Sequence, residues 1–181
     1  MEQCGKVTLK KIKRSIEPTI LKVQNTYISS FPSIERRDFL LFCDLLVYEQ
    51  RFNLFVVLNN DEYVGFISYW LFPDFIYIEH FAIDSNKRSA GIGVLAIKSF
   101  LALMNRPVIL EVENVVDELT ARRVRFYERI GFFFHSWAYK QPSYRKRDSW
   151  CDMRLMSYRM KDMENKFESI RDTLYRNVYQ K

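Results

Sequence analysis

Residues 76–84 read Ile76-Tyr-Ile-Glu-His-Phe-Ala-Ile-Asp84, and residues 88–93 read Arg88-Ser-Ala-Gly-Ile-Gly93. The first run is apolar enough for a buried strand, and the apolar residues that follow Gly93 are too dense for a loop. We therefore expect a strand, a glycine-containing turn and a helix, in that order. A Gly-x-Gly pair is often only a tight turn. At the start of a helix, however, glycines let the backbone approach a ligand, and the unpaired N–H groups there favour an anion. The order predicts a phosphate-binding turn.

The composition of the chain is that of one compact domain. It has 181 residues, of which 48% are apolar and 16% aromatic, enough for one core and too few for two full domains. No run approaches the roughly 20 apolar residues that a membrane span needs, so we expect a cytoplasmic protein that binds no membrane. The three cysteines are far apart, which indicates neither a disulfide framework nor a metal site. A net charge of +6 is mild and spread over the chain, so we expect no nucleic-acid partner.

The hydrophobic pattern along the chain predicts alternating strands and helices around these motifs. Strands are expected over 7–12, 52–58, 62–71, 75–84, 108–113, 132–139 and 152–160, and helices from about 18, from about 35, over 91–105, over 117–130 and from 160 onward. The last helix is amphipathic, with apolar positions from Met163 to Val178 at helical spacing. It is expected either to pack on the domain or to pair with a second chain. We expect a domain over 1–160 and a helical extension over 161–181.

A second motif, Tyr127-Glu-Arg-Ile-Gly131-Phe132, ends the predicted helix over 117–130. An aromatic pair on a helix that ends at glycine is by itself usually core and cap. Together with Arg88-x-x-Gly91-x-Gly93, however, it resembles the two signatures of the Gcn5-related N-acetyltransferase (GNAT) superfamily. The resemblance implies an α/β (α+β) fold, with a mixed, mostly antiparallel sheet that is flanked by helices and opens between the strands over 75–83 and 108–113.

The resemblance also implies that acetyl-CoA binds in that opening. Its pantetheine arm would pair with the backbone of Phe81, Ala82 and Ile83, and its pyrophosphate would lie on the N–H groups of Arg88, Ser89, Ala90, Gly91, Ile92, Gly93 and Val94. Many members carry Asn-Ala in the first turn of the helix that holds the tyrosine, but residues 120–123 here read Thr-Ala-Arg-Arg. Asn114 is the substitute contact that the sequence offers.

Acetyl transfer to an amine needs a base for the amine and an acid for the departing thiolate. Strict alternation along residues 75–83 places Phe75, Tyr77, Glu79, Phe81 and Ile83 on one face, and the resemblance implies a base on this strand. The resemblance points to Glu79 and Tyr77, and Glu79, the one carboxylate on this face, is the expected base; the alternative is a surface or salt-bridged carboxylate. His80 falls on the opposite face with Ile76, Ile78 and Ala82, as an ordinary core histidine. Tyr127, by its place in the motif, is the expected acid.

The acceptor is expected to be the primary amine of a small molecule. Glu111 and Glu113 lie two apart on one strand, where like charges raise at least one pKa, which suits proton transfer or attraction of a cationic amine; the alternative is a solvated face balanced by Arg122 or Arg123. Tyr77 joins them as an acceptor contact. Phe31, before the second helix, and Tyr144, in the basic loop over 139–150, belong to segments expected to narrow the pocket.

The reading of these residues leaves alternatives open. One is a protein or ribosomal-protein acetyltransferase, and another is a non-catalytic acyl-CoA-binding module. We expect direct transfer without a covalent intermediate or a metal, in a monomer or a homodimer.

Overall fold

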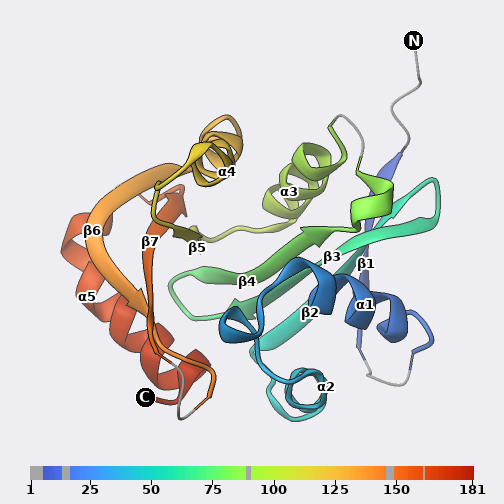
Figure 1. Ribbon diagram of the computed structural model, residues 1–181, viewed down its shortest axis with the longest axis horizontal. Helices are drawn as coiled ribbons and strands as arrows, with labels where there is room; N and C mark the ends of the chain where they lie inside the picture. The colour runs from blue at the N-terminus through green and yellow to red at the C-terminus, as the bar shows by residue number, and fades with distance from the viewer. Residues whose placement is uncertain (1–5, 14–16, 89–90, 146–148, 161) are drawn as a thin grey trace.

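The computed structural model describes residues 6–13, 17–88, 91–145, 149–160 and 162–181, and within these ranges it forms one seven-stranded sheet flanked by helices (Figure 1). The strands are β1 (Val7–Ile12), β2 (Phe52–Asn59), β3 (Glu62–Leu71), β4 (Ile76–Ile83), β5 (Val108–Glu113), β6 (Phe133–Gln141) and β7 (Cys151–Tyr158). The helices are α1 (Ile20–Ser30), α2 (Phe39–Tyr48), α3 (Ile92–Leu103), α4 (Glu118–Glu128) and α5 (Met163–Leu174), with short 3₁₀ turns at Ser33–Glu35 and Ser85–Lys87 and a π-helical turn at Tyr175–Tyr179.

The strand order is β1-β2-β3-β4-β5-β7-β6. Neighbouring strands are antiparallel except β4 and β5, which are parallel because α3 carries the chain from one to the other. The mixed, mostly antiparallel α/β fold predicted from the sequence is confirmed.

The sheet separates two hydrophobic cores. One contains side chains of α1, α2 and α5, and the other those of α3 and α4; in Figure 1, α3 and α4 lie above the sheet and α1 and α2 below it. The apolar positions of the C-terminal amphipathic segment, Met163, Ile170, Leu174 and Val178, are buried in the first core. That face is therefore used within the chain. Within the described ranges, no helix has both the length and the apolar character needed to cross a membrane.

The β2–β3 hairpin turns at Asn60 and Asp61, whose φ angles of 50° and 64° lie in the left-handed region that these residues tolerate. The pairing register shifts beside Gly65, so Val64 is an extra residue in β3. A Cβ on Gly65 would lie 2.3 Å from the carbonyl oxygen of Ala82 on β4. Glycine is required there because the two backbones approach too closely for any side chain.

A β-bulge at Glu79 changes the faces of β4. Ser68 pairs with His80 and the next residue of β3, Tyr69, pairs with Ile78, so Glu79 is the extra residue. Tyr77 consequently lies in the first core, whereas Phe81 packs against the second. The prediction that odd positions share one face, with His80 opposite Glu79, is wrong, because alternation holds only in a strand without a bulge.

β4 and β5 separate soon after they start. They pair only from Ile76 to Ile78 with Val108 to Leu110, although both strands continue beyond these residues. The opening between them matches the one expected from the resemblance. The bulge at Glu79 begins where the pairing ends.

Candidate active site

A cavity of about 690 Å³ occupies the opening between β4 and β5. Most of its wall comes from β4, β5, α4 and the segment after α1, and the turn after β4, α3 and β6 each add a residue. The wall includes Phe31, Glu35, Glu79, His80, Phe81, Ala82, Ile83, Arg88, Gly93, Glu111, Glu113, Arg122, Arg123, Phe126, Tyr127 and Gln141. The structure thus brings most of the described candidate residues to one place. The wall carries both charges: Arg88 follows β4, Arg122 and Arg123 lie on α4, and the carboxylates lie on β4, β5 and the α1–α2 segment.

The glycine turn precedes α3 as the sequence predicts. Gly91 is the N-cap of α3 with φ 98°, and no atom lies within 4 Å of where its Cβ would be. There is therefore room beside Gly91, and the first N–H groups of a helix have no partner within the helix, so an anion is favoured there. Arg88 donates from Nε to the carbonyl oxygen of Ile83 at 3.2 Å. Ser89 and Ala90 lie outside the described residues.

Gly93 lies behind this turn and lines the cavity. A Cβ there would be 3.5 Å from the ring of Phe126 and 3.8 Å from that of Phe81, both ordinary contacts. A methyl group would fit, but a longer side chain would fill the cavity. Ile92 is buried in the second core, that of α3 and α4, and Val94 packs against this core.

Residues 120–123, which lack the Asn-Ala pair expected in the first turn of this helix, have structural roles of their own. Thr120 forms a capping box with Asp117, in which the Thr120 N–H donates to Asp117 Oδ1 at 2.8 Å and the Thr120 hydroxyl accepts from the Asp117 N–H at 3.1 Å. Arg123 forms an ion pair with Glu113. Asn114 has a buried side-chain oxygen with no partner in the described part of the chain, but it does not line the cavity. Its contact with a cofactor stays a prediction.

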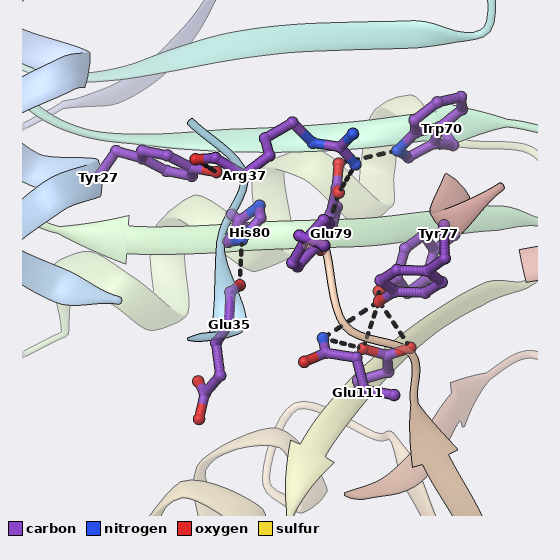
Figure 2. A network of polar contacts seen from close by, with 11 residues as sticks. Tyr27, Glu35, Arg37, Trp70, Tyr77, Glu79, His80 and Glu111 are labelled. Atoms are coloured by element: carbon purple, nitrogen blue, oxygen red, sulfur yellow. Dashed lines mark hydrogen bonds and ion pairs between the residues drawn. The ribbon is translucent and has the colours of Figure 1, made fainter. Parts of the chain in front are cut away.

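Glu79 is held by three donors (Figure 2). Arg37 forms an ion pair with it, Trp70 donates from its ring nitrogen at 2.9 Å, and the Tyr144 hydroxyl donates at 2.9 Å. Its side chain has no exposed surface. Burial acts to raise the pKa of Glu79, but the adjacent Arg37 guanidinium and the hydrogen bonds outweigh burial and lower it. Glu79 is therefore an ionised, fully paired carboxylate, which is a weak base.

His80, beside Glu79 on the same face, is buried between aromatic rings. Its ring centroid lies 4.9 Å from that of Tyr27 and 4.6 Å from that of Phe31. Nε2 lies 3.1 Å from the Glu35 carbonyl oxygen, which assigns the proton to Nε2 and leaves Nδ1 without a partner (Figure 2). Burial lowers the pKa of His80, so the ring is neutral.

Glu111, across the cavity from Glu79, has a different environment. It accepts hydrogen bonds from the hydroxyls of Tyr139 and Tyr179 and from Gln141 Nε2, the last at 2.6 Å. Burial raises its pKa to about 7. The sequence argument expected a raised pKa from the neighbouring Glu113, but the cause is burial, and Glu113 is paired with Arg123 instead. A carboxylate of this kind can exchange a proton near neutral pH.

Tyr127 lies in α4 with its ring against Phe126 and Phe132 and lines the cavity. Its hydroxyl forms no hydrogen bond within the described ranges, and burial raises its pKa to about 12. It is therefore protonated at neutral pH. A protonated hydroxyl at the cavity wall can donate to an anion that forms there.

The three remaining acceptor candidates occupy different positions. Phe31 lines the cavity beside His80. Tyr144 contacts Glu79 and lies under the Arg37 guanidinium, 4.8 Å from ring centroid to Cζ. Tyr77 is fully buried and does not line the cavity; its hydroxyl lies 3.0 Å from that of Tyr179.

Sequence reasoning missed Arg37, Trp70, Gln141 and Tyr179. Three of them carry no local signal, because their partners are distant in the chain. Gln141 could have been found: it lies two residues after Tyr139 on β6, and residues at that spacing share a face of a strand, as Glu111 and Glu113 do.

The comparisons with known proteins agree with this geometry. Residues 20–132 match the model of the acetyltransferase (GNAT) family. A structure from Bacteroides thetaiotaomicron that is described as a GNAT-family protein has 32% sequence identity and a TM-score of 0.91, over 95% of this chain and 98% of the other. The fold and the family match together define an acyltransferase, and the chain belongs to the GNAT acetyltransferase family. Among curated proteins, none matches significantly.

Two more distant structures share the fold. Arabidopsis thaliana Naa50, in complex with a bisubstrate analogue containing CoA, has 18% identity and a TM-score of 0.62 over 85% of this chain and 99% of its own. The ribosomal-protein-S18-alanine N-acetyltransferase from Escherichia coli has 17% identity and a TM-score of 0.58 over 87% and 98%. At these identities the likeness concerns the fold alone.

The residues present fit the acetyl-CoA that this family uses as cosubstrate. The cavity is open along β4 where strand pairing has ended, so backbone groups of β4 are available to a ligand. The start of α3 and the arginines Arg88 and Arg122 of the wall provide positive charge for phosphates, whereas Arg123 is paired with Glu113.

Proposed function

We propose that this chain is an N-acetyltransferase that moves the acetyl group of acetyl-CoA directly to a primary amine of a small-molecule acceptor. The observation that carries the choice of a small acceptor is the contact between the α1–α2 segment and the β6–β7 loop. Tyr144 of the loop contacts Arg37 and Glu79, and Arg145 forms an ion pair with Asp38 at 2.9 Å. A peptide acceptor needs an open groove, and these contacts join the two segments that would form its sides.

The cofactor supplies the acetyl group as a reactive thioester. Phe81, Ala82 and Ile83 would hold its arm through their backbone groups, and the start of α3 with Arg88 would hold its phosphates. The wall residues then act on protons. The amine must lose a proton before its nitrogen can bond to the acetyl carbon, and the sulfur that leaves must gain one.

Glu111 is better suited than Glu79 to take the proton from the amine. Glu79 has a lowered pKa and three donors, whereas the pKa of Glu111 is raised to about 7 by burial. Tyr127, whose hydroxyl has no hydrogen-bond partner among the described residues, lines the same cavity and would donate the proton to the sulfur. No covalent enzyme intermediate is part of the proposal.

The test is a panel of primary amines and a panel of short peptides, each incubated with acetyl-CoA while free thiol is followed. We expect release of free thiol with at least one small amine, and no release of thiol with the peptides. Release with peptides alone would replace the small-molecule acceptor with a protein. Binding of acetyl-CoA without release in either panel would favour a non-catalytic binding module. A cytoplasmic location, where acetyl-CoA is made and used, goes with this proposal.

A further inference from the structure

The C-terminal segment reaches the wall of the cavity. After α5 the chain forms the π-helical turn Tyr175–Tyr179, and Tyr179 is buried, with 6% of its surface exposed. Its hydroxyl lies 2.8 Å from Glu111 Oε2 and 3.0 Å from the hydroxyl of Tyr77. A π turn is rare and commonly occurs at functional sites. One residue near the end of the described chain thus connects β4 and β5 next to the point where they separate.

Gln141 completes this cluster. Its Nε2 donates to Glu111 Oε2 at 2.6 Å and to the Tyr179 hydroxyl at 3.1 Å, so both of its N–H groups are used. The opposite orientation of the amide would place its oxygen against the carboxylate, two acceptors together. The amide nitrogen, and not the amide oxygen, is therefore the partner of Glu111. The amide oxygen is buried and has no partner in the described part of the chain, and Gln141, which is 5% exposed as a whole residue, lines the cavity.

We propose that Glu111 and the amide oxygen of Gln141 form a subsite for the ammonium group of an alkylamine acceptor, and that Tyr179 is the residue that positions Glu111. This inference rests on the proposed function and narrows its acceptor to strongly basic amines. Such an amine enters protonated, with N–H groups that can donate to two acceptors at once. An unpaired buried acceptor is costly, and a donor from the ligand removes that cost at Gln141 Oε1.

None of the described groups that form hydrogen bonds with Glu111 carries a positive charge. Tyr77 faces it from β4, Tyr139 and Gln141 from β6, and Tyr179 from the C-terminal turn. Tyr144 of the β6–β7 loop is nearby, with its own ring against Tyr179 at 5.1 Å. Burial raises the pKa of each of these tyrosines well above its usual value. A bound ammonium would therefore be the only counter-charge in direct contact with Glu111 among the described groups.

The experiment compares two cations of similar shape, benzylammonium and benzyltrimethylammonium, binding to the full chain in the presence of coenzyme A. Both carry one positive charge, but only the first has N–H donors. By calorimetry at pH 8, we expect benzylammonium to bind at least about 10-fold more tightly, because hydrogen bonds that involve a charged group are the strong ones. Equal affinities in the wild-type protein would overturn the inference without any variant.

Variants then assign the residues. Gln141→Leu should reduce the preference for benzylammonium by about 10-fold. Tyr179→Phe removes a hydrogen bond that stabilises the charged form of Glu111, so the pH at which benzylammonium binding appears should move upward by about half a unit or more. Tyr175→Phe is the matched control on the same turn, since its hydroxyl donates to the Lys140 carbonyl oxygen at 2.6 Å instead; it should leave that pH unchanged.

The outcomes separate this inference from the proposed function. Turnover of an amine by a protein that binds both cations equally would refute the subsite and leave the acetyltransferase intact. A clear preference for benzylammonium without turnover of any amine would support the subsite and refute the enzyme. A folded Tyr179→Phe variant whose binding depends on pH as in the wild type would refute the positioning role.

Discussion

Replacing Glu111 by glutamine tests the electrostatics of the cavity without any ligand. Its pKa is about 7 in the folded protein and about 4.5 in the unfolded chain, so between these values the folded state binds a proton that the unfolded state has lost. This difference in bound protons fixes the sign of the pH dependence of the unfolding free energy. The unfolding free energy of the wild type should fall as the pH rises from about 4.5 to about 7, because folding then requires either a buried charge or an extra proton.

The size of the effect follows from the shift. A change from 4.5 to about 7 corresponds to about 3 kcal/mol for a group shielded from water. Glu111 is only partly buried and faces the cavity, so water screens its charge and we expect about 2 kcal/mol. Glu111→Gln cannot titrate and should lack this part of the pH dependence altogether.

The assay is urea unfolding of both proteins at several pH values from 4.5 to 8. Other groups that titrate, including His80, whose lowered pKa has the opposite effect on the slope, cancel in the difference between the two curves. Glu62→Gln is the matched control, because it removes one carboxylate charge at a side chain that is 73% exposed. Its unfolding free energy should depend on pH almost as that of the wild type does. Parallel curves for wild type and Glu111→Gln would show that Glu111 is ordinary and cannot serve as the proposed base.

Three further variants test the other parts of the site. Gly91→Asp places bulk and negative charge at the phosphate-binding turn, and acetyl-CoA affinity measured by calorimetry should fall by at least about 2 kcal/mol; unchanged affinity in a folded variant would remove the cofactor site from this turn. Glu79→Gln leaves Arg37 buried without a counter-charge, so it should lower the unfolding free energy by about 3 kcal/mol in denaturant, whereas normal stability with a lost acidic limb in the pH–rate profile would make Glu79 the base after all. Tyr127→Phe should leave the melting temperature almost unchanged, because the hydroxyl has no partner in the described ranges, and should slow turnover about 10-fold with acetyl-CoA binding retained; loss of stability with normal turnover would make Tyr127 a core residue.

The parts of the fold that follow from local sequence could be predicted. The glycine turn and the helix α3 depend on residues that are close in the chain, and so does the cap at Asp117. The succession of strands and helices along the chain follows from the same pattern. That succession and the family motifs therefore needed no long-range information, whereas the order of the strands in the sheet, with β7 between β5 and β6, depends on the folded chain.

The site required contacts that no local pattern contains. Arg37 reaches Glu79 across 42 positions, and Tyr179 reaches Glu111 across 68. The bulge at Glu79 was equally invisible, because apart from Glu79 and His80 the residues of β4 are apolar on both faces, so the pattern looks the same with or without an extra residue. Each carboxylate could be identified as a candidate from the sequence, but its protonation depends on partners that only the folded chain supplies.

The extra residue in β4 also determines which sequence changes this strand can accept in evolution. Deleting Glu79 would restore regular pairing with β3 and would leave His80 and Phe81 beside the same β3 partners, so their side chains would keep their faces. The deletion would, however, remove the carboxylate that Arg37 and Trp70 contact. A shorter β4 can therefore keep the two cores but cannot keep a carboxylate at this point of the cavity wall. We therefore expect functional homologues to vary in the residues of β4 while keeping its length between Ile78 and Ile83.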